Sequence, residues 1–500
     1  MDNDSSFDII IVGAGLSGIN AAYRLQQQLP HHRFTILEAR DVMGGTWAYW
    51  KYPGIRSDSA MGVFGFPWHP WPYDTNMAAA EDIHRYLEDA ATSQGIDKKI
   101  RFGHRCKAAS WSSEEQRWTL SVDVAGADGD VSTKEFKAWW LISAGGYYSY
   151  EKPMPAVIPG IENFKGEVVH PQFWDNSKHD YAGKKMVIIG SGATAVTLLP
   201  ALAKTAKSVT MLQRSPSYVF SLPARDRIVP IARMLLPLSW ATWLVWWKTM
   251  FTETLFVAFV KNFPTAARKM VMGAMKAQLP KGFDLDKHFN PSYPVFDQRL
   301  CLCPDGDFFK ALRQGNCDVV TDTIETVTER GILLKSGQEL QADMIITATG
   351  LFVLVLAGIP ILVDGERIDQ KINQRYLWNG TLLEGVPNSG AITGYTAGTW
   401  TPGADARTQT VIKVIKHMEK TGATAGMPYL NKEERERLPK KPALKNSSTY
   451  LVNARERLPI TADVGPWRNG TSWVIDMFYL LFGSAKSGMK YTVPVKAKRV

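Results

Sequence analysis

Three glycines with the spacing of a phosphate-binding turn come directly after an apolar run near the start of the chain. The run Phe7–Val12 predicts a buried strand, and it leads into Gly13, Gly15 and Gly18 and then into a helical pattern. In such a turn the first glycine permits the tight bend, and the second lets backbone N–H groups approach a pyrophosphate at the helix N-terminus. The third lets the helix pack closely on the strand. The motif predicts a dinucleotide-binding unit.

A carboxylate ends the next predicted strand. The strand Phe34–Leu37 stops at Glu38, 20 residues beyond Gly18. A carboxylate at this position accepts hydrogen bonds from both ribose hydroxyls and repels a 2′-phosphate, so it favours FAD or NAD. The alternative is a tight strand-to-helix turn with no ligand.

A second turn of the same kind lies further along the chain. Gly190 and Gly192 follow the predicted strand Met186–Ile189, and Ala195 stands where the third glycine would be. The packing role of that position tolerates alanine. Two dinucleotides on one chain are therefore expected.

The strand after the second turn ends without an acidic residue. Ser208–Leu212 runs into Gln213 and Arg214, which are both expected to contact the cofactor, and Arg214 stands where an adenosine ribose is expected. A guanidinium favours a 2′-phosphate through charge-assisted hydrogen bonds, so this unit is predicted to bind NADPH rather than NADH. A solvated surface arginine is the alternative.

The composition fits a globular enzyme. Hydrophobic residues make up 45% of the 500 positions and charged residues 21%, and this length allows two or three domains. The net charge of +10 is scattered outside the basic tail Lys486–Arg499, and no nucleic-acid motif accompanies it, so no nucleic-acid partner is expected. The four cysteines have neither a disulfide pattern nor metal-ligand spacing. The first strand begins near residue 7, which leaves no room for a cleavable signal sequence, and a cytoplasmic location is expected.

These features predict an α/β fold with two Rossmann-like units, in which the NADP unit is inserted in the FAD unit. The expected segments are 1–150 and 346–430 for the two parts of the FAD-binding domain, 151–221 and 291–345 for the two parts of the NADP-binding domain, 222–290 for a helical insertion that caps the substrate, and 431–500 for a C-terminal region.

The helical insertion contains an apolar run. Met234–Trp247 has 14 uncharged residues, includes Pro237 and stops at Lys248, so it is too short and interrupted to span a membrane. A buried cap over the active site is the favoured interpretation, and peripheral contact of residues 228–260 with a membrane surface is the alternative. Further on, Lys432–Lys441 is expected to be a solvated charged loop.

Two longer motifs resemble a known family. Gly44-Gly45-Thr46-Trp47, followed by Tyr52-Pro53-Gly54 and Asp58, resembles the longer fingerprint of the Baeyer–Villiger monooxygenases. Phe164-x-Gly166-x-x-x-His170-x-x-x-Trp174-Asp175 resembles their shorter fingerprint and lies between the two glycine turns. Segments such as Tyr52–Ser59 and Asp297–Leu302 are most similar to the subgroup that contains the ethionamide-activating monooxygenase.

The resemblance implies a class B flavin monooxygenase. Such an enzyme holds FAD, takes electrons from NADPH and captures O₂ as a flavin C4a-peroxide. It then inserts one oxygen atom beside the carbonyl of a ketone or aldehyde. The apolar insertion and the aromatic segment Gly394–Trp400 are expected to shape a pocket for a bulky apolar substrate.

The resemblance also assigns residues. Arg299 matches the catalytic arginine, whose permanent charge suits stabilisation of an anion, and Asp58 matches the acid that holds it near the flavin. Thr46, Trp47 and Asp58 are expected to line FAD, Cys106 to offer backbone to its adenine, and Arg56 to approach the nicotinamide half of NADPH. Gln298 departs from many relatives, which carry lysine there, and this places more of the NADPH preference on Arg214. His170 is expected to have a structural or hinge role.

Three other functions remain open from the sequence. Oxygenation at nitrogen or sulfur uses the same cofactors but needs the protonated hydroperoxide, whereas Arg299 favours the anion. A flavin-binding protein without turnover is the alternative of another class. A disulfide reductase is disfavoured, because Cys301-x-Cys303 is not the C-x-x-C pair that such an enzyme needs.

Overall fold

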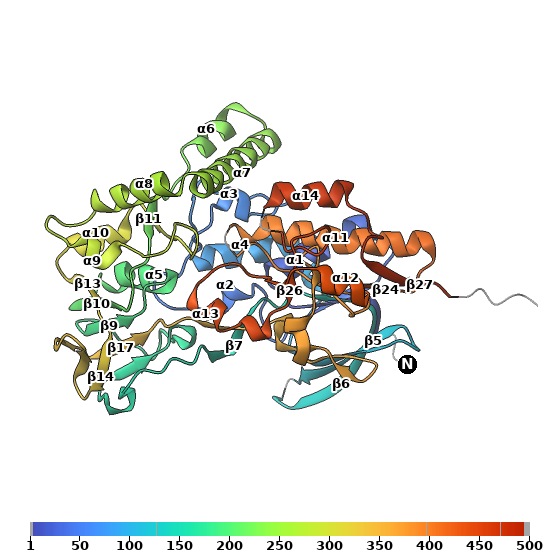
Figure 1. Ribbon diagram of the computed structural model, residues 1–500, viewed down its shortest axis with the longest axis horizontal. Helices are drawn as coiled ribbons and strands as arrows, with labels where there is room; N and C mark the ends of the chain where they lie inside the picture. The colour runs from blue at the N-terminus through green and yellow to red at the C-terminus, as the bar shows by residue number, and fades with distance from the viewer. Residues whose placement is uncertain (1–3, 127, 397, 471, 495–500) are drawn as a thin grey trace, which may run out of the picture.

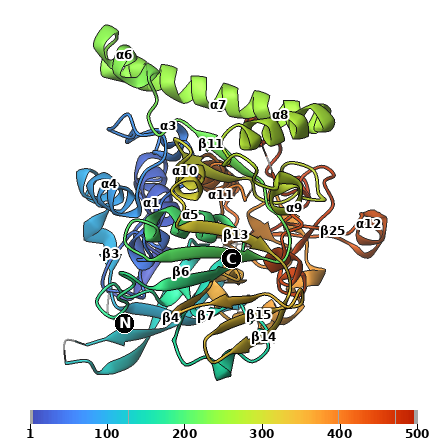
Figure 2. The same cartoon turned by 90° about the vertical axis from the view of Figure 1, so that its left-hand side faces the viewer.

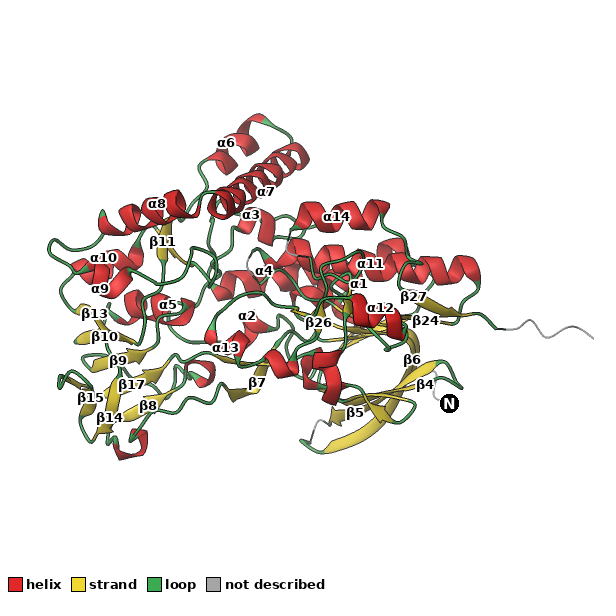
Figure 3. Cartoon of the chain, in the orientation of Figure 1, coloured by secondary structure: helices red, strands yellow, loops and turns green. Residues whose placement is uncertain are grey.

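The computed structural model describes residues 4–126, 128–396, 398–470 and 472–494. Ala397 of the aromatic segment and the part of the basic tail beyond residue 494 lie outside the described residues. Figure 1 shows two halves side by side, each built on its own sheet, and Figure 3 shows helices packed against both sheets.

The first sheet contains the strand and glycine turn nearest the N-terminus. Strands β1, β2, β3 and β6 pair in parallel, and β4 and β5 extend the sheet in antiparallel fashion. Its members are β1 (Ser6–Val12), β2 (Phe34–Leu37), β3 (Ile100–Arg101), β4 (His104–Ser112), β5 (Arg117–Ala125), β6 (Val131–Ser143), β19 (Ile361–Val363), β20 (Glu366–Arg367) and β23 (Ser389–Ala391).

The second sheet is fully parallel and carries the second glycine turn. Its strand order is β13-β10-β9-β17-β8. Its members are β8 (Glu167–Val169), β9 (Lys185–Ile189), β10 (Ser208–Gln213), β13 (Cys317–Thr321) and β17 (Met344–Thr347), and a three-stranded antiparallel sheet lies beside it with β14 (Ile324–Thr328), β15 (Gly331–Leu334) and β16 (Glu339–Gln341).

The second unit is inserted in the first. The chain leaves the first sheet after β6, builds the second sheet and returns to the first with β19 and β23. The two crossings run together, because β7 (Tyr148–Pro153) on the way out pairs with β18 (Leu351–Val353) on the way back. The predicted α/β fold with an inserted Rossmann-like unit is confirmed, while the exact segment boundaries stay a prediction.

Alternating side chains explain why each sheet is buried on both faces. Ile9 and Ile11 of β1 belong to one core cluster, whereas Ile10 and Val12 belong to the cluster on the opposite face. Because successive side chains of a strand point to opposite faces, a fully apolar run predicts a strand covered on both sides.

Helices cover these faces. α1 and α11 lie against each other on the first sheet with α4 beside them, while α5 and α10 pack on the second (Figure 3). Their bounds are α1 (Leu16–Gln28), α2 (Thr46–Tyr49), α3 (Met61–Phe64), α4 (Ala80–Ser93), α5 (Ala193–Leu202), α10 (Asp307–Arg313) and α11 (Trp400–Thr421).

The insertion is helical, as predicted, but its apolar run is not a buried cap. It forms α6 (Ile228–Leu235), α7 (Leu238–Asn262), α8 (Pro264–Lys276) and α9 (Leu285–Phe289), between β11 (Val219–Leu222) and β12 (Cys301–Pro304). Within the run 234–247 only Ala241 and Val245 are buried, and most of the large side chains are exposed. The prediction of burial is wrong because only one side of α7 meets the protein, whereas the large apolar side chains on its other side are exposed. Within the described ranges, every helix is too short or too polar to cross a bilayer.

The C-terminal region contains a helix where a loop was expected. Asn431 and Glu434 form a capping box, and α12 (Lys432–Arg437) follows it. The capping box satisfies backbone groups that would otherwise be unpaired, which is enough to start a short charged helix. The remaining strands and α-helices of the described residues are β21 (Leu377–Trp378), β22 (Leu382–Leu383), β24 (Ala425–Pro428), β25 (Lys441–Pro442), α13 (Thr449–Val452), β26 (Ile460–Thr461), α14 (Trp473–Phe482) and β27 (Met489–Thr492).

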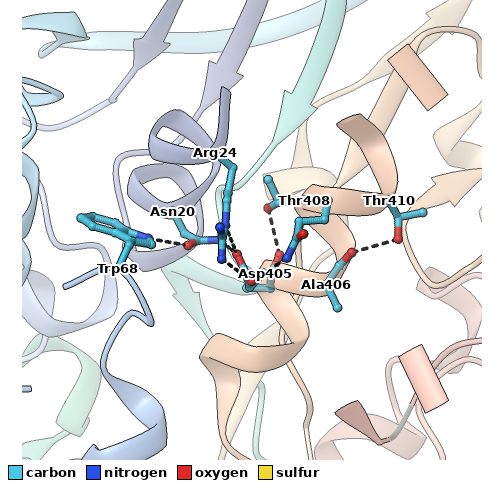
Figure 4. Close-up of polar contacts among 9 residues, drawn as sticks. Asn20, Arg24, Trp68, Asp405, Ala406, Thr408 and Thr410 are labelled. Atoms are coloured by element: carbon cyan, nitrogen blue, oxygen red, sulfur yellow. Dashed lines mark hydrogen bonds and ion pairs between the residues drawn. The ribbon is translucent and has the colours of Figure 1, made fainter. Parts of the chain in front are cut away.

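A buried polar network joins α1 to α11 (Figure 4). Asp405 accepts two hydrogen bonds from Arg24, at 2.7 and 2.8 Å, and one from Asn20 at 3.0 Å. Trp68 in turn donates to Asn20 at 3.0 Å. Each partner satisfies a buried polar atom of another, so the network fixes the two helices in register.

Replacing Asp405 should destabilise the protein strongly. Asp405→Ala leaves Arg24 and Asn20 without their acceptor in a buried site, which costs about 3 kcal/mol. We expect the midpoint of thermal unfolding to fall by several degrees. Glu114→Ala, at an exposed position, should leave it unchanged. An Asp405→Ala protein as stable as its parent would contradict this role.

Candidate functional site

The first glycine turn has the geometry that the sequence predicts. Gly13 has a φ of +104°, and a Cβ on Gly18 would lie 1.9 Å from the carbonyl oxygen of Gly13. Gly15 is the N-cap of α1, and among the described residues no side chain caps this helix end. The first N–H groups of α1 are therefore free to bind a phosphate.

Glu38 lies beside this turn, at the end of β2. Its buried carboxylate accepts hydrogen bonds from the backbone N–H of Ala14 at 2.8 Å and of Arg40 at 3.1 Å. These contacts hold the acid next to the phosphate-binding turn, where the ribose of a bound dinucleotide would lie.

The loop before α2 closes over the same turn. A Cβ on Gly45 would lie 3.0 Å from the Cα of Gly15, so the two backbones nearly touch. Thr46 follows as the first residue of α2, and Trp47 packs edge-on against Phe64 with ring centroids 5.7 Å apart. The structure thus brings Thr46 and Trp47 to the first nucleotide turn.

Cys106 lies on β4 at the same edge of the sheet. It lines a mainly apolar pocket together with Val12, Leu141 and Ser143. Burial raises the pKa of the Cys106 thiol to about 12, so the side chain stays protonated and acts as a small apolar group.

The second glycine turn repeats the arrangement. Gly190 has a φ of +137°, and a Cβ there would lie 2.4 Å from the carbonyl oxygen of Ala348. Ala195 is fully buried in the core, in agreement with its packing role. A Cβ on Gly192 would meet no atom of the described chain within 4 Å, and within that part of the chain no side chain caps α5. This space and these N–H groups fit a second pyrophosphate.

The two residues after β10 point in different directions. The Gln213 amide is buried and donates to the carbonyl of His288 at 2.6 Å and to the Thr321 hydroxyl at 2.9 Å. Its side chain therefore faces the protein, which does not support a direct contact with a cofactor. Arg214 is exposed, and no acid of the described residues pairs with it, so its guanidinium is free for a phosphate.

Arg299 and Asp58 form an ion pair between the two halves. The Nε of Arg299 donates to Asp58 Oδ2 at 2.8 Å, and one Nη donates to Oδ1, so the pair is bidentate. Asp58 follows α2 of the first unit, whereas Arg299 lies just before β12 of the second. The carboxylate raises the pKa of Arg299 well above its ordinary value, so the guanidinium is charged at every working pH.

An aromatic wall stands beside this pair. The sequence analysis identified Trp400 of this wall but not its two tyrosines. Tyr147 stacks on Trp400 with ring centroids 5.3 Å apart, and its hydroxyl lies 2.8 Å from that of Tyr148. Both tyrosines interact electrostatically with Arg299, and burial raises their pKa values. The signal was the tyrosine pair directly after the Gly145–Gly146 turn at the end of β6.

Arg56 bridges the halves at a second point. It pairs with Asp307, at the start of α10, with N–O distances of 2.9 and 3.3 Å. Arg56 therefore does reach the second unit, but its guanidinium already has a partner. Burial raises the pKa of the Asp307 carboxyl.

The shorter fingerprint lies at the junction of the units. His170 Nδ1 accepts the backbone N–H of Gln172 at 3.2 Å, and the Gln172 amide donates to the carbonyl of Ser149 at 2.9 Å. Burial lowers the pKa of His170. A neutral ring that orders backbone fits the structural role favoured by the sequence.

Glu253 is a partly buried acid that the sequence analysis did not single out. It lies on the inward side of α7, and both of its oxygens are within 3.2 and 3.3 Å of the Thr399 hydroxyl. Thr399 immediately precedes Trp400 of the aromatic wall. Burial raises the pKa of Glu253 to about 7.

Comparison with known proteins shows to which family the chain belongs. A family model described as an NAD(P)-binding Rossmann-like domain matches residues 11–79. The chain is 42% identical over 472 residues to the FAD-containing monooxygenase EthA of Mycolicibacterium smegmatis, and the match covers 94% of each chain. The chain belongs to the FAD-containing monooxygenases.

Solved structures of FAD-containing and related monooxygenases share the whole fold. A steroid monooxygenase bound to NADP superposes with a TM-score of 0.75 at 21% identity, covering 98% of this chain and 100% of the other. A cyclohexanone monooxygenase from Rhodococcus sp. Phi1 bound to NADP+ gives 0.75 at 18% identity, with the same coverage. At these identities the likeness establishes the architecture, and it confirms the predicted fold.

The raised pKa of Glu253 should make the stability of the fold depend on pH. Its pKa rises from 4.5 in the unfolded chain to about 7 in the fold, so ionisation opposes folding, and stability falls as pH rises through this window. Glu253→Gln removes that ionisation. We measure the thermal midpoint of unfolding of Glu253→Gln minus that of the parent. We expect this difference to be more positive at about pH 8 than at about pH 5. Glu329→Gln, exposed on the hairpin before β15, should show no such difference.

Proposed function

We propose that the protein binds FAD at the first glycine turn and NADPH at the second, and that it catalyses Baeyer–Villiger oxidation. In this reaction one atom of O₂ is inserted beside the carbonyl of a ketone or aldehyde. The observation that carries the proposal is the bidentate Arg299–Asp58 pair between the two nucleotide turns.

Membership of the FAD-containing monooxygenases supports the cofactors. The steroid and cyclohexanone monooxygenases that share the fold are bound to NADP, and both names are compatible with carbonyl substrates. FAD, when bound, supplies the activation of dioxygen with electrons from NADPH. Gly13, Gly15, Gly18 and Glu38 would hold it, with Thr46, Trp47, Asp58 and Cys106 around it.

Arg299 supplies a fixed positive charge at the site. Its planar donors stabilise negative charge on oxygen before and after attack on a carbonyl carbon, and its charge does not depend on pH. Asp58 occupies two donors and so fixes the plane of the guanidinium, which leaves the remaining donors for the reacting oxygens. This arrangement favours anionic attack over the protonated chemistry of sulfur or nitrogen oxygenation.

The surroundings favour an apolar substrate. Tyr147, Tyr148 and Trp400 form an aromatic wall beside the pair, while the Arg299 side chain stays accessible, with 41% of its surface exposed. A bulky, lipophilic ketone fits such walls better than a small charged keto acid.

Loss of Arg299 should abolish oxygen insertion. Arg299→Ala removes a transition-state donor worth about 3 kcal/mol, so we expect lactone formation from a cyclic ketone to fall by at least about 100-fold. Bound FAD, measured by its absorbance, should be unchanged, as should activity in the control Arg117→Ala, which is exposed on β5.

Product analysis distinguishes the alternatives. The parent enzyme is given a cyclic ketone and a thioether side by side, and lactone is expected. Sulfoxide without lactone would favour heteroatom oxygenation, and hydrogen peroxide alone over a broad ketone panel would favour a protein without turnover. Lactone formation that survives in Arg299→Ala would overturn the mechanism.

Arg214 should set the preference for NADPH. A lost charge-assisted contact to the 2′-phosphate costs roughly 1.5–3 kcal/mol, so Arg214→Gln should raise the KM for NADPH by about 10- to 100-fold. The KM for NADH serves as the internal control and should change little. Arg330→Gln, exposed in the same unit, should alter neither. An equal change for both nucleotides would show that Arg214 does not read the phosphate.

A further inference from the structure

Large apolar side chains gather on one side of the molecule without cover. They belong to α6, α7 and α14, which form the upper side in Figure 1, and Figure 2 shows α6, α7 and α8 as a long ridge across it. We call this set the outer face: Ile231, Met234, Leu235, Leu238, Trp240, Trp243, Trp247, Phe251, Leu255, Val474, Ile475, Phe478, Leu481 and Phe482.

The outer face is continuous although its helices are far apart in sequence. Trp473 at the start of α14 meets Trp246 and Trp247 of α7, with ring centroids 5.0 and 5.5 Å apart. The exposure is substantial, at 65% for Trp240, 57% for Phe478 and 75% for Phe482. A contiguous apolar patch of this kind marks a surface that binds something.

The inward side of α7 is already used. Val245 and Thr249 pack against Gly62 of α3, and Glu253 bonds to Thr399. Because these contacts fix the orientation of α7, its outer side faces away from the protein. A rotation of α7 that covered the outer side would expose Glu253 instead.

The charges around the outer face are positive. Residues 225–276 contain eight basic side chains and two acidic ones. Both acids have partners: Lys248 pairs with Asp226, and the Thr399 hydroxyl donates to Glu253. In the described part of this segment the exposed charges are all basic: Arg225, Arg227, Lys261, Lys269 and Lys276.

From these observations we propose that α6, α7 and α14 dock the protein on the surface of a bilayer that contains anionic phospholipid. Tryptophan and phenylalanine are the side chains that enter the boundary between headgroups and acyl chains, and basic residues beside them are attracted to anionic headgroups. A second copy of the chain fits less well, because it would bring two sets of exposed basic side chains together.

The test is flotation of the FAD-loaded enzyme with vesicles. With about one third phosphatidylglycerol in phosphatidylcholine, most of the protein should float with the lipid, and with phosphatidylcholine alone or in high salt about 10-fold less should do so. The tryptophan fluorescence should shift to the blue on binding.

Matched variants locate the contact. Trp240→Ser combined with Trp243→Ser and Phe478→Ser should reduce vesicle binding at least about 10-fold. The control Phe102→Ser with Val131→Ser and Val157→Ser changes exposed apolar residues elsewhere and should bind like the parent. The thermal midpoint of unfolding shows that each variant is folded.

A charge variant tests the proposal independently of the aromatic residues. Arg227→Glu with Lys261→Glu and Lys269→Glu should lose binding to anionic vesicles. Failure of the parent to float, or equal binding by all variants, overturns the proposal. A third outcome also overturns it: the parent does not bind vesicles but forms a concentration-dependent dimer, and the serine variant does not dimerise. That result would assign the outer face to contact with a second copy of the chain.

Discussion

The ion pair between Arg299 and Asp58 joins residues 241 positions apart in sequence and connects the two nucleotide-binding units. A guanidinium alone at this position would be free to rotate and would carry an unbalanced charge among aromatic side chains. Bidentate pairing removes both problems, because two parallel hydrogen bonds fix the plane of the cation and the carboxylate offsets its charge. The orientation of the reactive donors therefore depends on how the two units sit relative to each other.

That relative position has its own supports. Arg56 and Asp307 form a second ion pair across the halves, and the strands β7 and β18 pair where the chain crosses between them. In the first unit, Asp405 of α11 accepts hydrogen bonds from Asn20 and Arg24 of α1 and so holds these two helices together. Since the N-terminus of α1 carries the first glycine turn and that of α11 carries Thr399 and Trp400, one buried network positions both the nucleotide turn and the aromatic wall.

The sequence predicts features whose physical cause is local. Gly13, Gly18 and Gly190 were identifiable because their backbone geometry excludes a side chain, and apolar runs indicated strands buried on both faces. Contacts over long distances were harder to predict: the inward turn of Gln213, the pairing of Arg56 with Asp307 and the burial of Glu253 follow from tertiary packing. The Arg299–Asp58 pair was expected only through a family resemblance, and helix α12 was missed because its capping box stood in a charged stretch.

The apolar run in the insertion shows that composition alone does not predict whether a helix is buried. A helix that is apolar all round is usually buried, since exposed apolar area costs free energy. α7 breaks this expectation because it lies between two environments: its inward side meets α3 and Thr399, and most of the large apolar side chains on its outer side are exposed. Sequence periodicity cannot distinguish these sides when both are apolar. The charges can, because the exposed charges of residues 225–276 are all basic, while both acids of this segment have partners within the protein. The same helix therefore carries Glu253 to Thr399, next to the aromatic wall, and holds Trp240 and Trp243 on its exposed side.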